Sequence, residues 1–594
     1  MADYVAPLRD MRFVYHELLG LDALAEWPGY GEATPDIVDA VLEEAARFCA
    51  EVLAPLNRSG DEQGCRLVDG TVLTPDGFRE AYAAFIEAGW NTLAMPPEHG
   101  GQGLPHALDL LVTEMVSGTN LAFGMYSGLT EGTVDALSAF ASDELKAIYL
   151  ERLVSGRWSG TMCLTEAQAG TDLGLLRTRA EPREDGSYAI TGTKLFISAG
   201  DHDLTENIVH LVLARLPDAP PGVKGISMFV VPKRLVAADG SCGAPNAVSC
   251  GALEHKMGIH ASATCVMNFD GASGWLVGEP HRGLRAMFTM MNAARIYVGV
   301  QGLGLAQASY RGAADYAAER LQGRAPGAAP HPEAPADPLT AHPDVRRMLL
   351  TMRAWVEGCR MLAIWTASLL DEAALHPDGA RRAAADDAVA LLTPVVKAFI
   401  TDVAFEVTNL GMQVYGGHGY IREHGMEQRV RDARITQIYE GTNGIQALDL
   451  LGRKLGADFG RRLRPVFHPL QAFVDAHAGD PELAAWVAPL AKALDRLQRA
   501  TLLLAERGLR DPAQAAAGAS DYLRLLGLVL LGYLWARAAQ LALARQADDD
   551  DGFYRAKRLT ASFYMERLLP QSGALFAALG GDARALLEFD ARQF

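Results

Sequence analysis

The chain has less positive than negative charge. Its 594 residues include 54 Lys and Arg against 72 Asp and Glu, which gives a formal net charge of −18. A protein that binds nucleic acid needs a basic surface to displace counterions from the phosphates. Between residues 456 and 594, Arg is frequent, but Asp and Glu are about as frequent. The charge balance therefore disfavours a nucleic-acid partner.

Cysteine is scarce and scattered. The seven cysteines are odd in number, and none belongs to a CxxC pair. This pattern excludes a disulfide framework and gives no ligand spacing for zinc, so no metal site is expected. We interpret these residues as reduced thiols of a cytoplasmic protein.

Long hydrophobic runs are also missing. The longest, Leu525 to Ala536, lies between Arg524 and Arg537, and it is shorter than the ~20 residues that a membrane-spanning helix needs. We predict a buried helix there and no membrane span. The first residues, MADYVAPLRDMRF, carry charges of both signs and no apolar stretch, so no signal peptide is expected.

Hydrophobic periodicity changes along the chain and predicts four domains. Residues 1–157 show helical spacing, with helices expected at 36–54 (ended by Pro55), 78–90 and 108–121. Residues 158–278 contain short runs rich in Val, Ile, Phe and Thr, which predict an all-β domain. Helices resume over 279–455, interrupted by a Pro/Ala-rich surface loop at 325–341 and restarted at Pro343. A further helical domain is expected over 456–594, with helices at 481–507, 520–545 and 551–569. The fold class is therefore α+β.

The stretch from Gln413 to Leu455 holds a Gly-rich turn and a lone carboxylate, Glu440, in the sequence YEGTNG. A carboxylate between apolar residues and a new helix is well placed to act as a desolvated base. The alternative is a helix-capping loop, because Thr442 and Asn443 are good N-cap residues.

Two segments of the β region could contact a flat ligand. MCLTEAQAGTD (162–172) offers small residues for close backbone approach and the hydroxyls of Thr165 and Thr171. KLFISAG (194–200) offers an aromatic ring at Phe196 and a hydroxyl at Ser198. By composition alone, an ordinary strand and turn is the favoured interpretation of each segment.

Residues 413–455 resemble the C-terminal signature of the acyl-CoA dehydrogenases, flavoenzymes in which the Glu of YEGT removes the α-proton of an acyl-CoA. TEAQAGTD is similar to the family's flavin-binding TEPxAGSD, with Ala167 in place of Pro and Thr171 in place of Ser. The resemblance implies an N-terminal helical domain, a middle β-barrel-like domain and a C-terminal four-helix bundle. The additional C-terminal helical domain resembles the large bacterial members, including the subgroup acting on 3-methylmercaptopropionyl-CoA.

The resemblance also implies a set of site residues. Glu440 would be the catalytic base, and Thr171, Arg295 and Gly441 would contact the substrate. Residues similar to the family's FAD-binding positions are Met162, Leu164, Thr165, Gly170, Thr171, Phe196, Ile197, Ser198, Arg320, Gln413, Gly416, Gly417, Thr442 and Asn443.

Some of these roles can be stated more closely. Phe196 would cover one face of the flavin, and Ser198 would reach its N5. Arg320 would reach the FAD pyrophosphate of a neighbouring subunit, which implies a homodimer, with a tetramer possible. The usual RxxFG-type ending beside this Arg is altered here to RLQGR.

The implied reaction is α,β-dehydrogenation of an acyl-CoA thioester to the trans-2-enoyl-CoA, with hydride passing to FAD. Electron-transfer flavoprotein is the expected acceptor; an acyl-CoA oxidase that uses dioxygen is the alternative, disfavoured by the bacterial-type tail and the ending ARQF in place of SKL. A DNA-associated flavoprotein is disfavoured by the acidic charge, and an inactive scaffold by the intact YEGTNG. The acyl group stays open between a short thioether and a medium or long straight chain, with Met290, Met291 and Tyr126 as candidate lining residues.

Overall fold

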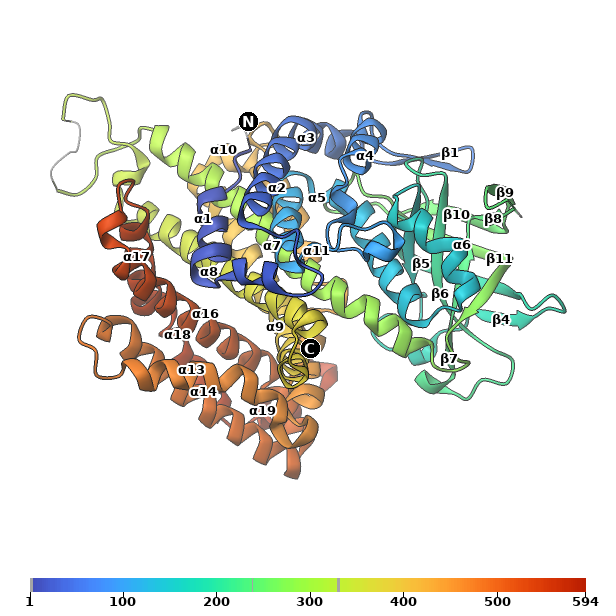
Figure 1. Ribbon diagram of the computed structural model, residues 1–594. Coiled ribbons are helices and arrows are strands. Elements are labelled where there is room, and N and C mark those ends of the chain that lie inside the picture. The colour runs from blue at the N-terminus through green and yellow to red at the C-terminus, as the bar shows by residue number, and fades with distance from the viewer. Residues whose placement is uncertain (1–3, 238, 328–331) are drawn as a thin grey trace. The chain divides into compact units, whose positions relative to one another are not determined.

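The computed structural model describes residues 4–237, 239–327 and 332–594 (Figure 1). The chain forms two compact units: unit 1 comprises residues 1–43, 105–114 and 298–594, and unit 2 comprises residues 44–104 and 115–297. The chain passes from one unit to the other four times: within α2 (Pro35–Phe48), between Leu104 and Pro105, within α5 (His106–Phe140) and within α7 (Gly283–Glu319).

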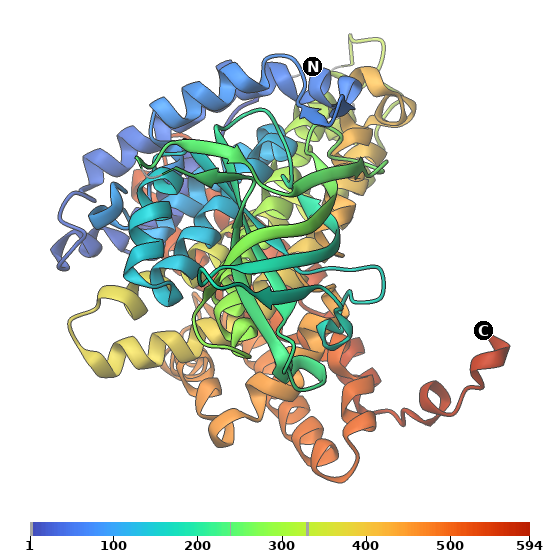
Figure 2. The same cartoon turned by 90° about the vertical axis from the view of Figure 1, so that its right-hand side faces the viewer.

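Unit 2 is built on a seven-stranded sheet. Its strands are β3 (Trp158–Cys163), β4 (Arg179–Pro182), β5 (Tyr188–Ser198), β6 (Asn207–Arg215), β7 (Ile226–Pro232), β10 (Val248–Leu253) and β11 (Thr264–Val277). The pairings run β11–β5–β4–β6–β7 and return to β11, and the strands curve accordingly in Figure 2. Because this ring of pairings closes, the predicted β-barrel-like domain is confirmed.

Helices cover this sheet within unit 2. They include the part of α5 beyond residue 114, α6 (Asp143–Val154) and the first half of α7. Leu137, Tyr149, Trp158, Met228 and Met287 belong to one buried apolar cluster that joins these helices to the strands. The remaining elements of the unit are α3 (Ala54–Gln63), α4 (Phe78–Glu87) and the hairpins β1–β2 (Arg66–Val68, Thr71–Leu73) and β8–β9 (Arg234–Val236, Cys242–Pro245).

Two helices predicted in the N-terminal region do not end where the sequence predicted. The helix at 36–54 does not stop at Pro55: after α2, a π-helical segment (Cys49–Leu53) leads into α3, where Pro55 occupies the first turn. A proline costs no hydrogen bond in a first turn, because that N–H has no helical partner. The helix predicted to end at Leu121 continues to Phe140, with a non-helical residue, Asn120, at a kink.

Unit 1 is centred on long helices. Its α8 (Pro343–Leu375) and α9 (Gly379–Tyr415) are joined by residues 376–378, and α8 begins at Pro343 as predicted. The second half of α7 packs closely on α9, because a Cβ at Gly299 would lie only 2.7 Å from the carbonyl oxygen of Val396. The short helices α10 (Gly417–Tyr420), α11 (Met426–Thr436) and α12 (Asn443–Asp449) follow α9. Part of the predicted loop at 325–341, residues 328–331, lies outside the described residues.

The C-terminal part of unit 1 is helical, as predicted. Its helices are α13 (Arg464–His477), α14 (Ala484–Arg510), α15 (Pro512–Ala517), α16 (Ala519–Ala544), α17 (Phe553–Phe563), α18 (Gln571–Gly580) and α19 (Arg584–Leu587). Helices α9 and α16 are long and apolar enough to cross a membrane, but 78% and 83% of their most apolar windows are buried within the protein. They are core helices, which confirms the buried helix predicted at Leu525 to Ala536.

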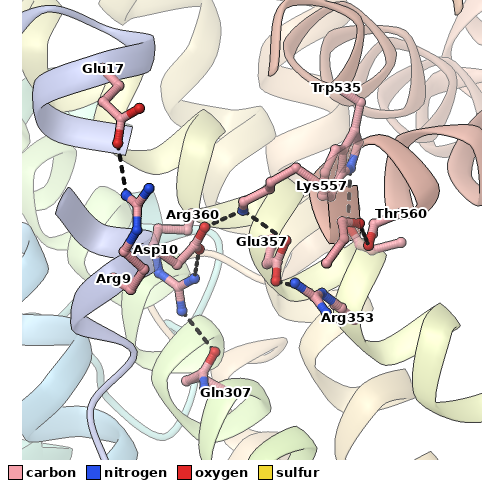
Figure 3. Close-up of polar contacts among 12 residues, drawn as sticks. Arg9, Asp10, Glu17, Gln307, Arg353, Glu357, Arg360, Trp535, Lys557 and Thr560 are labelled. Carbon is pink, nitrogen blue, oxygen red and sulfur yellow. Dashed lines mark hydrogen bonds and ion pairs between the residues drawn. The ribbon is translucent and has the colours of Figure 1, made fainter. Parts of the chain in front are cut away.

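A buried network of charged side chains joins segments of unit 1 that are far apart in sequence (Figure 3). We call it the charge cluster, and its members are Asp10, Glu114, Arg353, Glu357, Arg360 and Lys557. Arg360 and Lys557 are completely buried and both bind Asp10. Lys557 also donates to Glu357 at 2.8 Å, and Arg360 to Glu114 at 2.9 Å. The cluster therefore links helix α17 of the additional domain to the N-terminal segment and to α8.

Candidate active site

The predicted site residues are divided between the two units. Unit 1 contains Arg320, Gln413, Gly416, Gly417, Glu440, Gly441, Thr442 and Asn443. Unit 2 contains Met162, Leu164, Thr165, Gly170, Thr171, Phe196, Ile197, Ser198 and Arg295.

In unit 1, the loop 437–443 carries Glu440 between α11 and α12. The loop is closed by a hydrogen bond from the Asn443 N–H to the Gln437 carbonyl, 3.1 Å long. Glu440 has a φ of 56° and Gly441 a φ of 87°. The left-handed region costs a residue with a side chain roughly 1–2 kcal/mol. Such strain persists only where the surrounding structure enforces it, and it gathers at functional sites.

The backbone at Glu440 is fixed by a buried amide. Gln446, in the first turns of α12, has no exposed surface, and its Nε2 donates to the carbonyl oxygens of Glu440 (3.3 Å) and Gly441 (3.1 Å). Beside the carboxylate, the Tyr439 hydroxyl donates to Gln301 Oε1 at 2.6 Å. Burial and the negative charge of Glu440 raise the pKa of Tyr439 above its ordinary value. Tyr439 therefore stays protonated and acts as a donor that packs against the loop.

Thr442 and Asn443 begin α12 in different ways. Thr442 is exposed, and it caps the helix through its backbone carbonyl, which accepts from the N–H groups of Ile445 (2.8 Å) and Gln446 (3.1 Å). Its side chain makes no capping hydrogen bond. The side chain of Asn443 is bound by residues of α9, including Lys397, whose Nζ lies 2.8 Å from Asn443 Oδ1. A cofactor contact by Asn443 would therefore involve its backbone.

The Gly-rich turn after α9 presents open backbone. Gly416 has φ 59° and ψ −136°, a conformation that only glycine adopts readily. Gly416 and Gly417 are exposed, as is Gln413 in the last turn of α9, and no atom lies within 4 Å of where a Cβ of either glycine would be. Arg320, just after α7, is also exposed, and it forms no ion pair with any residue that the structure describes. The Gly416 N–H is already donated to the Gln413 carbonyl at 3.0 Å, so what this turn offers is a backbone that no side chain covers. Such a backbone, together with a guanidinium, suits the close approach of a pyrophosphate.

In unit 2, Phe196 lies in a β-bulge of strand β5. Cys265 of β11 opposes Ile197 and Met267 opposes Lys194, so Leu195 and Phe196 together face the single residue between them. The bulge gives Phe196 a φ of 58° and leaves 61% of its side chain exposed. Bulges re-aim side chains beside functional sites. The ring is thus presented for a flat ligand in place of packing in the core.

A buried ion pair joins the two segments predicted to bind flavin. Lys194 is completely buried, and its Nζ lies 2.9 Å from Glu166 Oε1 and 3.0 Å from the Leu164 carbonyl. Next to it, the Leu195 N–H donates to the Thr165 carbonyl at 2.9 Å. These bonds hold the loop after β3 against the bulge of β5, which brings Thr165 and Phe196 onto neighbouring segments.

Glu166 receives an unusual number of donors. Besides Lys194, they are the Thr178 hydroxyl (2.6 Å), the N–H groups of Arg177 (2.7 Å) and Thr178 (3.0 Å), and the Gln168 amide (2.6 Å). Burial opposes ionisation, but the charge of Lys194 and these donors outweigh it and lower the pKa of Glu166 to about 2. The carboxylate is thus ionised at neutral pH.

The other predicted residues of unit 2 differ in exposure. Leu164 and Ile197 are buried, Met162, Thr165 and Ser198 are half-buried, and Gly170 and Thr171 are exposed. Arg295 is 7% exposed on α7, with Nη1 3.2 Å from Asn292 Oδ1 and its guanidinium 5.8 Å from the centre of the Phe288 ring.

Two of the candidate lining residues are also in the core of unit 2. Met290 and Tyr126 are fully buried. The hydroxyl of Tyr126 donates to the Ala261 carbonyl at 2.9 Å and accepts from the Ala263 N–H at 3.0 Å.

Sequence reasoning missed four residues that support the site: Glu166, Lys194, Lys397 and Gln446. A signal was present for three of them. Glu166 and Lys194 are charges inside otherwise apolar or small-residue segments. Lys397 is likewise a lone cation in a strongly apolar stretch. In the part of the chain that the structure describes, no group of three or more His, Cys, Asp or Glu could hold a metal ion.

Comparison with known protein families identifies the fold. The chain matches four family descriptions in succession: acyl-CoA dehydrogenase, N-terminal domain (residues 36–157), middle domain (161–272) and C-terminal domain (281–455), followed by acetyl-CoA dehydrogenase C-terminal like (466–590).

Individual relatives match this chain over nearly its whole length. The chain is 45% identical to a 3-methylmercaptopropionyl-CoA dehydrogenase of Ruegeria pomeroyi, covering 98% of this chain and 99% of the relative. It is 35% identical to the broad-specificity linear acyl-CoA dehydrogenase FadE5 of Mycobacterium tuberculosis, covering 96% of each. The crystal structure of an acyl-CoA dehydrogenase complexed with FAD from Bacillus anthracis shares the fold, with a TM-score of 0.74 at 21% identity, over 94% of this chain and 90% of that one.

The chain belongs to the acyl-CoA dehydrogenase family, in the form that carries an additional C-terminal domain. It is an acyl-CoA dehydrogenase, an FAD-dependent oxidoreductase. The expected fold class is confirmed, and so is the family that the YEGTNG and TEAQAGTD motifs indicated.

Proposed function

We propose that this enzyme converts an acyl-CoA thioester to the trans-2-enoyl-CoA, with Glu440 as the base that removes the α-proton. The observation that carries this assignment is the left-handed backbone at Glu440 and Gly441, held by the buried amide of Gln446. A carboxylate on a strained, enforced loop is pre-organised, and Gly441 leaves room beside it for a substrate.

Removing an α-proton from a thioester creates negative charge on the thioester carbonyl oxygen. The backbone N–H of Glu440 is our candidate for one donor to that oxygen. A single donor of this kind is worth roughly 3 kcal/mol of transition-state stabilisation.

FAD fits the residues present. When bound, it supplies the redox chemistry by accepting the β-hydrogen as hydride. We assign the flavin ring to Phe196, Thr165 and Ser198 of unit 2, where an exposed aromatic ring lies on a bulge. We assign the pyrophosphate to the open backbone at Gly416 and Gly417 and to Arg320 of a second subunit. The proposal also includes the remaining predicted contacts. Those with FAD are made by Met162, Leu164, Gly170, Thr171, Ile197, Gln413, Thr442 and Asn443. Those with substrate are made by Thr171, Arg295 and Gly441.

The names of two relatives support a proposal for the substrate class. The Ruegeria pomeroyi enzyme, 45% identical over nearly the full length of both chains, is named for 3-methylmercaptopropionyl-CoA. We therefore propose a short acyl-CoA with a thioether as the first substrate, and a linear acyl-CoA, as in the name of FadE5, as the second. We further propose electron-transfer flavoprotein as the acceptor, a homodimer as the assembly and the cytoplasm as the location.

The test is anaerobic mixing of the purified yellow protein with a panel of acyl-CoAs, followed by the visible absorbance of oxidised flavin. We expect rapid bleaching by 3-methylmercaptopropionyl-CoA and slower bleaching by straight chains. Bleaching by straight chains alone would contradict the substrate assignment, and bleaching by none would contradict the reaction. Turnover in air with peroxide release, and none with electron-transfer flavoprotein, would identify an oxidase instead.

A further inference from the structure

A fully buried lysine of unit 1 points at the loop that carries Glu440. Lys397 lies within α9 and has no exposed surface. Its Nζ donates to Asn443 Oδ1 at 2.8 Å. Removing an ammonium group from water costs several kcal/mol unless strong partners compensate. A lysine at this position therefore calls for a reason beyond filling space in the core.

Both polar atoms of the Asn443 side chain are bound by residues of α9. Its oxygen accepts from Lys397, and its Nδ2 donates to Asp402 Oδ1 (2.7 Å), Thr401 Oγ1 (2.9 Å) and the Ala398 carbonyl (3.2 Å). An amide offers one acceptor oxygen and two hydrogens. The cation on one side and the carboxylate on the other also fix which way the amide faces.

The same helix holds the other end of the loop. Asp402 Oδ1 accepts from Gln437 Nε2 at 2.6 Å, so Gln437 and Asn443 converge on one carboxylate. The loop between them contains the strained Glu440 and Gly441. Two turns of α9 thus clamp both ends of a segment whose middle is forced into the left-handed region.

We infer that Lys397, Asp402 and Asn443 are positioning residues that set the orientation of the catalytic carboxylate; we call them the loop anchor. This inference rests on the proposed role of Glu440. The loop anchor does not take part in the reaction itself, and it acts by preventing the loop from relaxing to an unstrained conformation. Misplacement of a catalytic group by about 1 Å can cost about 10²-fold in rate.

The test is a charge swap between two residues of the loop anchor. In Asn443→Asp, the new carboxylate still accepts from Lys397 but faces Asp402, so the two repel. In Asp402→Asn, the amide oxygen can still accept from both Gln437 and Asn443, so this single change should cost less than Asn443→Asp. In the double variant, the amide introduced at position 402 can donate to the carboxylate introduced at position 443, which restores complementarity.

Two readouts are needed. The first is the anaerobic rate of flavin reduction at saturating acyl-CoA, with FAD content measured on each variant. We expect about a 10²-fold loss in Asn443→Asp, a smaller loss in Asp402→Asn, and recovery of at least about tenfold in the double variant relative to Asn443→Asp. Rates are compared at equal bound FAD and at saturating acyl-CoA, because Gly441, Thr442 and Asn443 of the same loop are proposed contacts of substrate and FAD.

The second readout is amide hydrogen exchange of residues 437–446, which needs no turnover. Exchange should be faster in Asn443→Asp and return toward wild type in the double variant. If Asn443→Asp does not fold, Lys397→Met provides the same comparison, because it removes the donor to Asn443 Oδ1. If no acyl-CoA bleaches the flavin of the wild-type protein, the proposed function is contradicted. A wild type that is bleached, with Asn443→Asp and Lys397→Met variants that keep its rate and its hydrogen exchange, would contradict the role of the loop anchor.

Discussion

Replacing Lys557 with Met should loosen the additional C-terminal domain from the rest of unit 1. The charge cluster holds three cations and three anions, so removing one cation leaves two against three. Lys557 is completely buried and pairs with both Asp10 and Glu357. Burial alone would raise the pKa of Asp10, but Lys557 and Arg360 outweigh it and hold the carboxyl ionised. Breaking such a buried pair costs about 3–5 kcal/mol.

The assay is native-state hydrogen exchange of α17 and of residues 8–18. A chain of this size does not unfold in one step, so the opening free energy of each segment is a better measure than a global midpoint. Met nearly matches Lys in length, so the loss reports on charge and not on a cavity. Adding Glu357→Gln should recover part of the loss, because the cluster then has two charges of each sign.

The control is Lys492→Met, which changes an exposed lysine of α14 in the same domain. It should alter stability by less than about 0.5 kcal/mol. If Lys557→Met destabilises α17 no more than Lys492→Met does, the charge cluster is not what joins the domain, and packing of α16 on α8 and α9 would be the better account.

Two further predictions concern the flavin-binding segments of unit 2. Glu166 is ionised, with its pKa lowered from 4.5 to about 2, so its contribution to stability is complete above pH 4.5 and is lost as the pH falls toward 2. In Glu166→Gln, the release of FAD by acid, measured by flavin fluorescence, should depend less steeply on pH across that range. An unchanged slope would refute the assignment. Phe196→Ala should weaken FAD retention with little loss of protein stability, because the residue is 61% exposed. Equal FAD content in the variant and wild type after gel filtration would show that the ring does not cover the flavin.

The sequence predicts the fold class well because the signals are local and repeated. Helical periodicity and β-rich runs locate the helical and β regions, and an apolar stretch between Arg524 and Arg537 correctly indicates a buried helix. The ends of helices and strands are harder to predict, as Pro55 shows. A proline that could stop one helix can equally begin the next.

The supporting residues of the site are beyond local patterns. Nothing near Lys397 in the sequence indicates that it meets Asn443, because that contact depends on how α9 packs against a loop far along the chain. The same holds for Lys194 and Glu166, which are joined by a bulge, and for Lys557, whose partners lie near the N-terminus and in α8. Motifs identified the groups proposed for the chemistry, and the structure adds the residues that hold them.

The most direct test of the account is the rate of anaerobic flavin reduction in Glu440→Gln, compared with wild type at equal FAD content and equal thermal stability. Glutamine keeps the size of the side chain but cannot accept the α-proton, and loss of a general base typically removes a factor of ~10²–10⁴. We predict a yellow protein that binds acyl-CoA and is not bleached on the time scale of the wild type. A Glu440→Gln variant that is bleached at the wild-type rate would contradict the assignment of Glu440 as the base.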